Sequence, residues 1–395
     1  MRSRKSFYLG GNMETRTISD RQTFKNMKQE WNTLAAQFTS PFLRHEWFEV
    51  CLDTLYPQGV SPRIVAVYSG NRLRAVAPLI CVRRAGVRQL QVAGADMIHE
   101  PCGFLYDSEA ALLELFHAVF EQRTSLALSR FNVKAQETEI LRGRWSKGGF
   151  RIDSCGASSL RVPLKRTWKE FEASMSSGRR SDLRGYRRRA EQLGQVEFEV
   201  VEPEAGTLTR HLEEFYQVEA SGWKGREGSA ILCQPHTLQF YTDYARSAAE
   251  AGMLRLFFLR IAGKTIAARM AVEHSNRLWD LRLGYDETFR RCAPGVLLTH
   301  ETLRFAVERG LDAYEFLGRA EAWERHWPCE EEQYASMRVY PLSLEGQLSL
   351  VQDGCRLVSM KTSSMIQARL NRATAKVMAL PGGSTYLEEG FVLLH

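Results

Sequence analysis

The chain has 395 residues, of which 44% are hydrophobic and 25% are charged, enough apolar sequence for two buried cores. Its 53 lysines and arginines exceed its 46 aspartates and glutamates, and the net charge of +7 suits an anionic ligand without identifying one. The cysteines and histidines show no spacing typical of zinc or of a disulfide framework, and no segment approaches the roughly 20 apolar residues of a membrane-spanning helix. We therefore expect a cytoplasmic α/β protein without a metal site and without a membrane span.

The ends and the domains can be predicted from composition and pattern. Residues 1–12 are basic but lack an apolar core, so they do not resemble a signal peptide and are expected to be disordered. Met13 is an alternative start. We expect a first domain over 13–165, a second over 166–345, and a C-terminal helix and tail over 346–395, with the oligomeric state left open.

Two similar α/β units follow from the pattern of strands and helices. Residues 63–79 alternate apolar and polar side chains around a Ser-Gly-Asn turn, which predicts a β-hairpin, and residues 255–271 do the same around Gly263. After each hairpin the sequence predicts a strand, a loop, a helix and a strand. These elements are expected at 89–93, 109–121 and 126–131 in the first unit, and at 278–283, 296–309 and 313–317 in the second. The shared order indicates a repeat, although such a succession is common enough to arise by chance.

The stretch between the two units is predicted to be helical. Thr167 and Glu170 have the spacing of a capping box, and a second helix over 181–193 carries several arginines. This basic helix fits a solvated face and fits equally well a lip that binds a nucleotide or an RNA. Further helices are expected at 207–222 and 236–251.

The loop before the last predicted helix of the second unit favours phosphate binding. Arg290 and Arg291 precede the run 293–295, Ala-Pro-Gly, and the helix follows at once. Free N–H groups at a helix N-terminus together with two guanidinium groups are suited to an anion. The corresponding loop of the first unit has Asp96 and Glu100 but no arginine. We therefore expect the anion site in the second unit.

Several short sequence runs are spread over residues 30–345, and their order along the chain is more specific than any one of them. In chain order they are Trp31, Pro41-Phe42, Glu46-Trp47, Ala77-Pro78-Leu79, the basic helix 181–193, Arg291-x-x-Pro294-Gly295, Phe316-Leu317-Gly318, Glu321, Trp323 and Trp327. Together they resemble the GNAT acyltransferase superfamily, specifically its FemAB-like tandem branch, which includes CelD-like proteins of polysaccharide loci. The resemblance implies two tandem GNAT-like domains packed together, with acetyl-CoA or another acyl-CoA as co-substrate in the second.

The resemblance also implies where the acyl donor lies. Its pantetheine arm would fill the gap between the strands at 278–284 and 313–317, with the pyrophosphate at the following helix. The implied donor-binding residues are Arg282, Leu283, Gly284, Arg290, Arg291, Cys292, Ala293, Gly295 and Val296. Ala293 stands where the superfamily pattern has glycine, so its Cβ would obstruct a close backbone approach. Pro294 lacks an N–H group but fits the first turn of a helix.

Direct acyl transfer needs positioned reactants, a base and an oxyanion contact, but no covalent nucleophile. Asp286 and Glu273 are candidate bases, with Asp280 as a further one. Tyr285 is a candidate acid, and strand N–H groups near 282–284 would hold the oxyanion. The residues expected to contact the acceptor are Trp223, Lys224, Arg184, Glu321 and Trp323. Each carboxylate also fits a solvated strand end, and Trp223 also fits core packing.

Three functions remain open at this point. The first is transfer of an acyl group, by expectation acetyl, to an amine or hydroxyl of a small-molecule or glycan-precursor acceptor of the cell envelope or of polysaccharide synthesis. The second is a FemAB-like transferase that uses aminoacyl-tRNA, which the arginines of 179–189 favour. The third is a catalytically silent binding module, which Ala293 favours.

Overall fold

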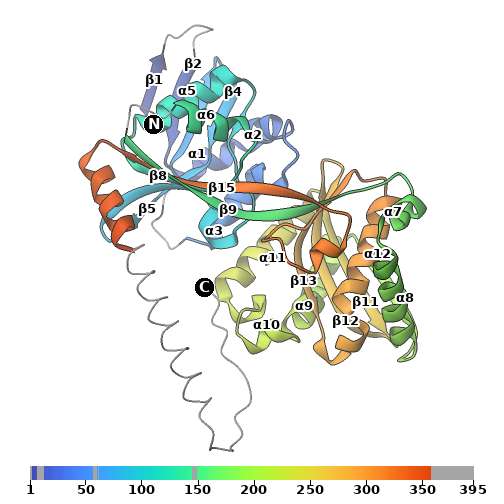
Figure 1. Cartoon of the computed structure of the whole chain (residues 1–395). Helices are drawn as coiled ribbons and strands as arrows, with labels where there is room; N and C mark the ends of the chain where they lie inside the picture. The colour runs from blue at the N-terminus through green and yellow to red at the C-terminus, as the bar shows by residue number, and fades with distance from the viewer. Residues whose placement is uncertain (1, 7–12, 57–59, 61, 145–148, 357–395) are drawn as a thin grey trace, which may run out of the picture.

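The computed structural model describes residues 2–6, 13–56, 60, 62–144 and 149–356. These residues form two α/β halves joined by one continuous sheet, which confirms the predicted mixed α/β class (Figure 1). Residues 2–6, expected to be disordered, instead form a strand that pairs with Met13–Thr17. The helix predicted over 357–378 lies outside the described residues.

The first half contains a short sheet in the order β1-β2-β3-β4-β7 and one end of the long sheet. Its elements are β1 (Arg2–Ser6), β2 (Met13–Ile18), α1 (Arg21–Asn26), α2 (Lys28–Ala35), η1 (Pro41–Leu43), α3 (His45–Thr54), β3 (Ile64–Ser69), β4 (Arg72–Ala77), β5 (Leu79–Arg84), β6 (Val87–Val92), α4 (Ala95–Ile98), β7 (Leu105–Tyr106), α5 (Glu109–Phe120), β8 (Ser125–Asn132) and α6 (Gln136–Arg144). The predicted hairpin is confirmed as β3 and β4. The strand predicted at 89–93 belongs to a second hairpin, β5 and β6, which joins the long sheet.

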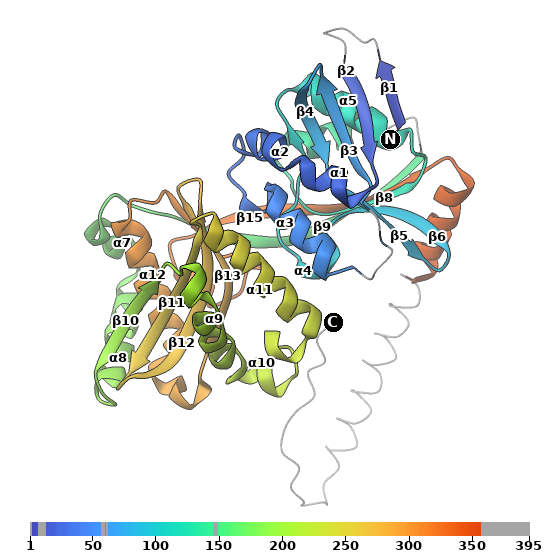
Figure 2. The same cartoon turned by 180° about the vertical axis from the view of Figure 1, so that it is seen from behind.

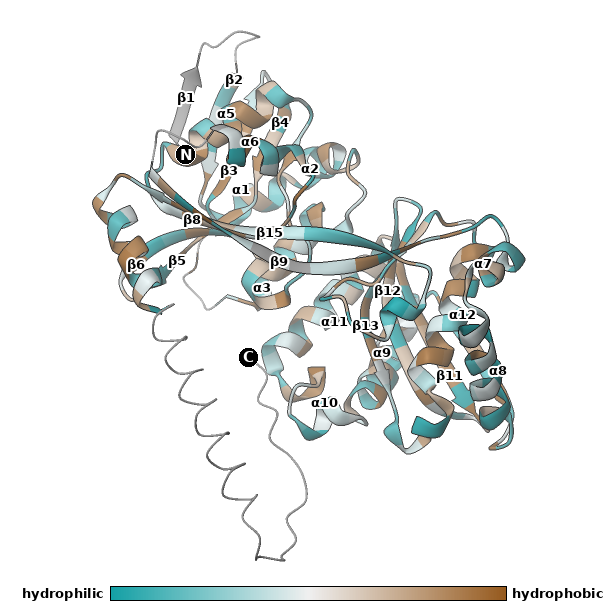
Figure 3. Cartoon of the chain, viewed as in Figure 1, coloured by the Kyte–Doolittle hydropathy of each residue, from teal (hydrophilic) through white to brown (hydrophobic). Residues whose placement is uncertain are grey.

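The second half is a sheet covered by helices on both faces. Its elements are α7 (Trp168–Ser174), α8 (Ser177–Glu191), β10 (Val196–Val201), α9 (Ala205–Ala220), α10 (Trp223–Arg226), η2 (Ile231–Cys233), α11 (Pro235–Glu250), β11 (Leu254–Ile261), β12 (Lys264–His274), β13 (Arg277–Tyr285), η3 (Glu287–Cys292), α12 (Pro294–Glu308), β14 (Ala313–Glu315) and η4 (Glu324–His326). Side chains alternate along β11, so Leu256 and Phe258 share a core with α9 and α11, while Phe257 and Leu259 share the other core with α12. Hydrophobic residues accordingly gather on the strands and on the helix sides that cover them (Figure 3).

Two long antiparallel strands, β9 (Gly149–Pro163) and β15 (Glu330–Pro341), connect the halves (Figure 1). The start of β15 pairs with the end of β9, whose last residues pair with β14 in the second half. β15 pairs with β9 along its whole length, and its residues from Tyr334 to Val339 also pair with β8 in the first half on the other edge. Residues 344–356 then form a helix, and Glu345 bonds Arg88 of β6 at 2.9 Å. The chain therefore returns to the first half before the predicted boundary at residue 345.

The predicted repeat is visible in the strand pairing. In the first half β6 runs parallel to β8, with Gln89 opposite Ser125. In the second half β13 runs parallel to β14, with Arg277 opposite Ala313. Both members of the second pair follow those of the first by the same number of positions, as two copies of one unit require.

The helices α3 and α11 lie side by side where the halves meet (Figure 2), and aromatic side chains pack there. The Trp47 ring makes edge contacts with Phe240 at 5.2 Å and Tyr244 at 4.8 Å, and Phe42 contacts Trp279 at 5.7 Å. All five side chains are buried and belong to a core that spans both halves. The interface thus has the composition of a protein interior and holds the halves in one arrangement.

Candidate active site

The parallel strands β13 and β14 pair only where they begin and then separate. Their register joins Arg277–Trp279 to Ala313–Glu315 and ends there. On its other edge β13 pairs with β12, and the register slips so that Leu281 has no partner residue. Such a β-bulge bends a strand and re-aims its backbone groups. Residues 281–285 therefore turn an open strand edge toward the space beside β14.

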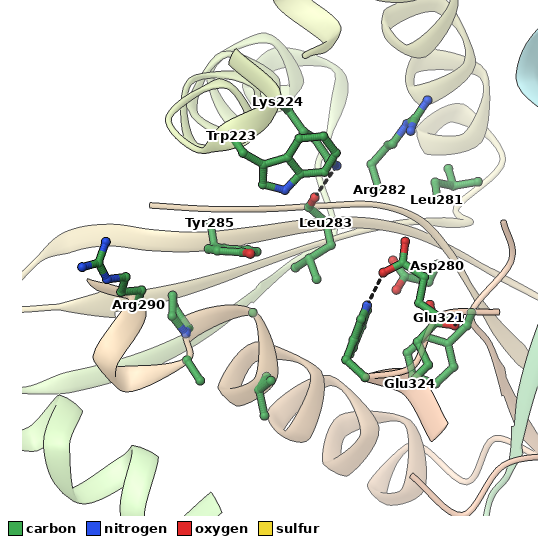
Figure 4. Close-up of a pocket in the computed structure, with 16 residues that line it drawn as sticks. Trp223, Lys224, Asp280, Leu281, Arg282, Leu283, Tyr285, Arg290, Glu321 and Glu324 are labelled. Carbon is green, nitrogen blue, oxygen red and sulfur yellow. Dashed lines mark hydrogen bonds between the residues drawn. The ribbon is translucent and has the colours of Figure 1, made fainter. Parts of the chain in front are cut away.

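A cavity of about 510 Å³ lies along this edge, within the size range of small-molecule sites (Figure 4). The lining residues are Trp223, Lys224, Asp280, Leu281, Arg282, Leu283, Tyr285, Arg290, Ala293, Pro294, Gly295, Val296, Phe316, Glu321, Trp323 and Glu324. Arg290 lies at one end, beside the start of α12, and Glu321 and Glu324 lie at the other (Figure 4). The cavity thus has a basic end and an acidic end.

The basic end is the turn into α12. Ala293 has φ 46° and ψ 60°, a left-handed conformation that glycine would adopt without strain, and Pro294 takes the first helical position. The N–H groups of Val296 and Leu297 bond to the Ala293 carbonyl at 3.0 Å. Because the positive pole of α12 and the Arg290 side chain meet here, this end is suited to an anion.

The acidic end follows β14. The Glu324 carboxylate accepts a hydrogen bond from the Glu321 N–H at 2.9 Å, and the Trp323 indole donates to the Glu321 carboxylate at 2.5 Å. Burial raises the pKa of the Glu324 carboxyl to about 8, and the nearby charges of Glu321 and Asp280 add to this rise. A carboxyl with such a pKa can take up or release a proton near neutral pH, as a general base must.

A buried polar chain beneath the cavity links its two ends. Asp280 accepts a hydrogen bond from the Tyr314 hydroxyl at 2.7 Å and lies 3.2 Å from Nε of Arg269, which is fully buried. Arg269 donates to the Thr299 hydroxyl at 2.8 Å, and that hydroxyl donates to the Gly295 carbonyl at 2.8 Å. Burial raises the pKa of Asp280, while Arg269 and Tyr314 oppose the rise. This chain fixes β12, β13 and the start of α12 relative to one another.

Lys224, on α10, lines the cavity opposite the start of α12. Its ammonium donates to the Leu283 carbonyl on β13 at 2.9 Å and lies 3.4 Å from the buried carboxylate of Glu219 (Figure 4). Burial lowers the pKa of Lys224, and Glu219 opposes the decrease. Lys224 therefore contacts the strand edge that a bound arm would share.

Most residues assigned to the site from the sequence line the cavity. These are Trp223, Lys224, Arg282, Leu283, Tyr285, Arg290, Ala293, Gly295, Val296, Glu321 and Trp323. They come from α10, from β13 and the turn after it, and from the segment after β14, so the fold brings together the three regions singled out from the sequence.

Asp286, expected to act as a base, is not part of the cavity wall. Its carboxylate accepts hydrogen bonds from the Thr288 N–H at 2.9 Å and the Thr288 hydroxyl at 2.6 Å, and from Lys264 at 2.8 Å. Burial would raise the pKa of Asp286, but the bonds from Lys264 and Thr288 hold it below its usual value. The structure therefore gives Asp286 the role of capping η3.

Five other assigned residues also lie outside the cavity wall: Glu273, Gly284, Arg184, Arg291 and Cys292. Glu273 bonds Arg255 at 2.9 Å near the end of β12, and Gly284 packs against the backbone of α9. Arg184 is exposed on α8, the Arg291 carbonyl accepts a bond from α8, and Cys292 is buried in the core of the second half.

The sequence assignment missed several residues of the wall. They are Leu281, Pro294, Phe316 and Glu324, together with Asp280, which the sequence suggests as a further base but not as a residue that lines the site. Glu324 matters most because of its perturbed pKa. Its one sequence signal is its place three residues after Glu321, in the segment that follows a predicted strand.

Several arginine side chains of the basic helix α8 make contacts within the fold. The Arg179 guanidinium stacks over the Trp327 ring at 4.3 Å, Arg180 donates to the Met175 carbonyl at 2.6 Å, and Arg187 pairs with Glu191 at 2.8 Å. Such contacts fix side chains that would otherwise be free to bind a partner, and they account for part of the arginine cluster.

Two kinds of feature are absent from the described ranges, a metal site and a membrane-spanning helix. There, no cluster of three or more histidine, cysteine, aspartate or glutamate side chains is arranged to hold a metal ion. Within the same ranges, no helix has the length and apolar character needed to cross a membrane.

Comparison with known proteins finds a family resemblance in the second half and a fold shared over most of the chain. Residues 177–325 match the family model described as an acetyltransferase (GNAT) domain, whereas no curated protein matches the sequence. The crystal structure of FemX is 13% identical with a TM-score of 0.55, over 82% of this chain and 96% of that one. The structure of L-PGS from Bacillus licheniformis is 13% identical with a TM-score of 0.52, over 87% of this chain and 98% of that one. The chain thus has a GNAT-like fold, and its residues 177–325 match the GNAT acetyltransferase domain model.

Proposed function

We propose that the chain transfers an acyl group, by expectation acetyl, from acyl-CoA to an amine or hydroxyl acceptor of the cell envelope or of polysaccharide synthesis. The observation that carries the proposal is the cavity itself, which follows an open strand edge from a basic helix N-terminus to a pair of carboxylates. The nature of the acceptor, and the CelD-like relationship from which it is inferred, remain predictions.

The donor would lie along β13. Its pyrophosphate would meet Arg290 and the positive N-terminal pole of α12, where negative charge is favoured. Its pantetheine arm would run along β13 from Tyr285, past Leu283, to the bulge at Leu281. These four residue steps span about 13 Å at roughly 3.3 Å per strand residue. Lys224 would give up its bond to the Leu283 carbonyl as the arm enters.

The reaction would then take place at the acidic end. Glu324 removes a proton from the acceptor, whose nitrogen or oxygen bonds to the acyl carbon. Backbone N–H groups at the bulge hold the oxyanion until the carbon–sulfur bond breaks. The leaving thiolate then takes up the proton that Glu324 removed, because Tyr285, the acid expected from the sequence, lies beside Gly295 toward the basic end of the cavity. Glu324 replaces Asp286 as the proposed base because it lines the cavity and its pKa is raised, whereas the pKa of Asp286 is lowered.

The test is release of free CoA from acetyl-CoA in the presence of a panel of amines, amino sugars and sugar hydroxyls. We expect acceptor-dependent release by the wild type and a loss of about 10²-fold or more with Glu324→Gln. Glu273→Gln is the matched control, because Glu273 lies outside the cavity wall. Equal loss in both variants would contradict the role of Glu324, and the absence of release by any acyl-CoA would contradict the proposed donor.

Aminoacyl-tRNA is the second candidate donor. Arg184 and Arg188 are exposed on α8, which contacts the turn before α12 through the bond from Arg189 to the Arg291 carbonyl at 2.7 Å. A tRNA bound there would dissociate steeply with added salt. Saturable tRNA binding that Arg184→Glu weakens, together with no binding of acetyl-CoA, would favour this candidate. If neither donor binds, the silent binding module is favoured.

A further inference from the structure

The chain leaves the sheet for three residues directly after β14. The Phe316 N–H bonds to the Leu160 carbonyl of β9 at 2.9 Å, and the Ala320 N–H bonds to the Ser158 carbonyl at 2.7 Å. Between these bonds, residues 317–319 bulge away from β9. Leu317 has φ 60° and Gly318 has φ 56°, so two successive residues are left-handed. This conformation is unfavourable for leucine and persists only where the surroundings hold it.

The first half holds this bulge. Arg130 of β8 donates to the Gly318 carbonyl at 2.8 Å, and Glu100 accepts a bond from the Gly318 N–H. Both side chains are more than nine-tenths buried, and the Arg130 guanidinium stacks over the Tyr334 ring at 4.8 Å. The backbone N–H and C=O groups of one residue of the second half are therefore bound by two side chains of the first.

The groups around Glu100 also connect it to the cavity. Burial raises the pKa of Glu100 to about 7, while the charges of Arg130 and Arg282 oppose the rise. Arg282 lines the cavity, and the other carboxylate oxygen of Glu100 has no hydrogen-bond partner in the described structure. Retaining a buried, partly unsatisfied carboxylate is costly, which argues for a role beyond packing.

The bulge determines where the acidic end of the cavity begins. Phe316, just before it, lines the cavity, and the Leu317 side chain turns into the core shared with the first half. The chain then resumes at Ala320 and leads directly to Glu321 and Glu324. A shift of the Gly318 peptide would therefore move both carboxylates relative to β13.

We propose that Arg130 and Glu100 are positioning residues, by which the first half sets the acidic end of the active site in the second half. The inference rests on the proposed function for its catalytic consequence and on geometry alone for the clamp. On this account the first half completes the acceptor side of the site, while donor binding at β13 and α12 depends on the second half.

Two measurements on Arg130→Met test the clamp. Hydrogen exchange at Ala320, Glu321 and Glu324 should be at least tenfold faster than in the wild type, while exchange in α12 stays unchanged. Acetyl-CoA affinity, measured by calorimetry, should change less than twofold, while acceptor-dependent CoA release falls tenfold or more. Arg130→Lys, which keeps the charge and a donor, should recover part of the turnover.

Arg151→Met is the matched control. Arg151 lies at the end of β9 nearest the first half and also bonds backbone carbonyls, those of Leu141 at 2.7 Å and Arg142 at 2.8 Å, but it does not line the cavity. It should leave exchange at the three amides and turnover unchanged. Wild-type exchange at these amides in Arg130→Met, or an equal fall in donor affinity and turnover, would overturn the proposal. The exchange result needs no donor, so it is independent of whether acyl-CoA is the correct co-substrate.

Discussion

Replacement of Gly295 by alanine should affect donor affinity and folding stability in different directions. Gly295 is the second residue of α12, and a Cβ added to it would lie 3.1 Å from Cδ1 of Tyr285 and 3.5 Å from Cδ2 of Leu283. Alanine is favoured over glycine in a helix by up to about 1 kcal/mol, and the Tyr285 ring need move only slightly. We therefore expect Gly295→Ala to unfold at the wild-type temperature or up to roughly 2 °C higher.

The same methyl group should weaken donor binding. It would project toward Leu283 and Tyr285, along the part of the cavity where we place the pantetheine arm. An obstruction of this kind should cost about 1.4 kcal/mol or more, which is a tenfold loss of affinity for acetyl-CoA. Calorimetric titration and thermal unfolding of the same preparations measure both effects.

Gly206→Ala is the matched control. Gly206 is the second residue of α9, and no atom lies within 4 Å of a Cβ added there. It should change stability as Gly295→Ala does, without altering acetyl-CoA affinity. If the wild type binds acetyl-CoA and Gly295→Ala binds it equally well, the placement of the arm is refuted.

Three further changes test the acidic end, the buried chain and the interface. The turnover of the wild type should rise with pH through the Glu324 pKa of about 8, and Glu324→Gln should abolish that rise. Because folding raises this pKa, ionisation of Glu324 destabilises the native state increasingly as pH rises from about 5 to about 8. The unfolding temperature of Glu324→Gln should therefore rise relative to that of the wild type over this pH range. A difference in unfolding temperature that stays constant with pH would contradict this. Arg269→Met leaves buried Asp280 without its counter-ion and should lower the urea-derived free energy of unfolding by about 3–5 kcal/mol, and adding Asp280→Asn should recover much of the loss. Trp47→Ala removes the ring contacts to α11 and should cost about 3–5 kcal/mol in the same assay, whereas a loss below about 1 kcal/mol would show that the interface contributes little.

The elements and the site loop could be predicted because their signals are local. Alternating side chains around Gly70 and Gly263 predict the two hairpins, and both are present. The arginines and the Ala-Pro-Gly run before α12 likewise predict a turn into a helix, and Arg290 lines the cavity there. Such features depend on neighbouring residues alone.

What the sequence did not predict depends on contacts between distant segments. The pairing of β15 with both β9 and β8 joins residues far apart in the chain, so no local pattern specifies it. Glu324 becomes a candidate base only through burial, which depends on the folded chain around it. The role of Asp286 is different, because an aspartate two residues before Thr288 is itself a signal for a cap.

The central claim is that acyl-CoA binds between β13 and β14 with its phosphates at Arg290, and calorimetry tests it most directly. Wild type, Arg290→Glu and Arg291→Glu would each be titrated with acetyl-CoA at the same ionic strength. Both substitutions change the net charge equally, but only Arg290 lines the cavity. We predict saturable binding by the wild type, a loss of at least tenfold with Arg290→Glu, and a change of less than threefold with Arg291→Glu. No binding by the wild type, or equal losses in the two variants, would contradict the claim.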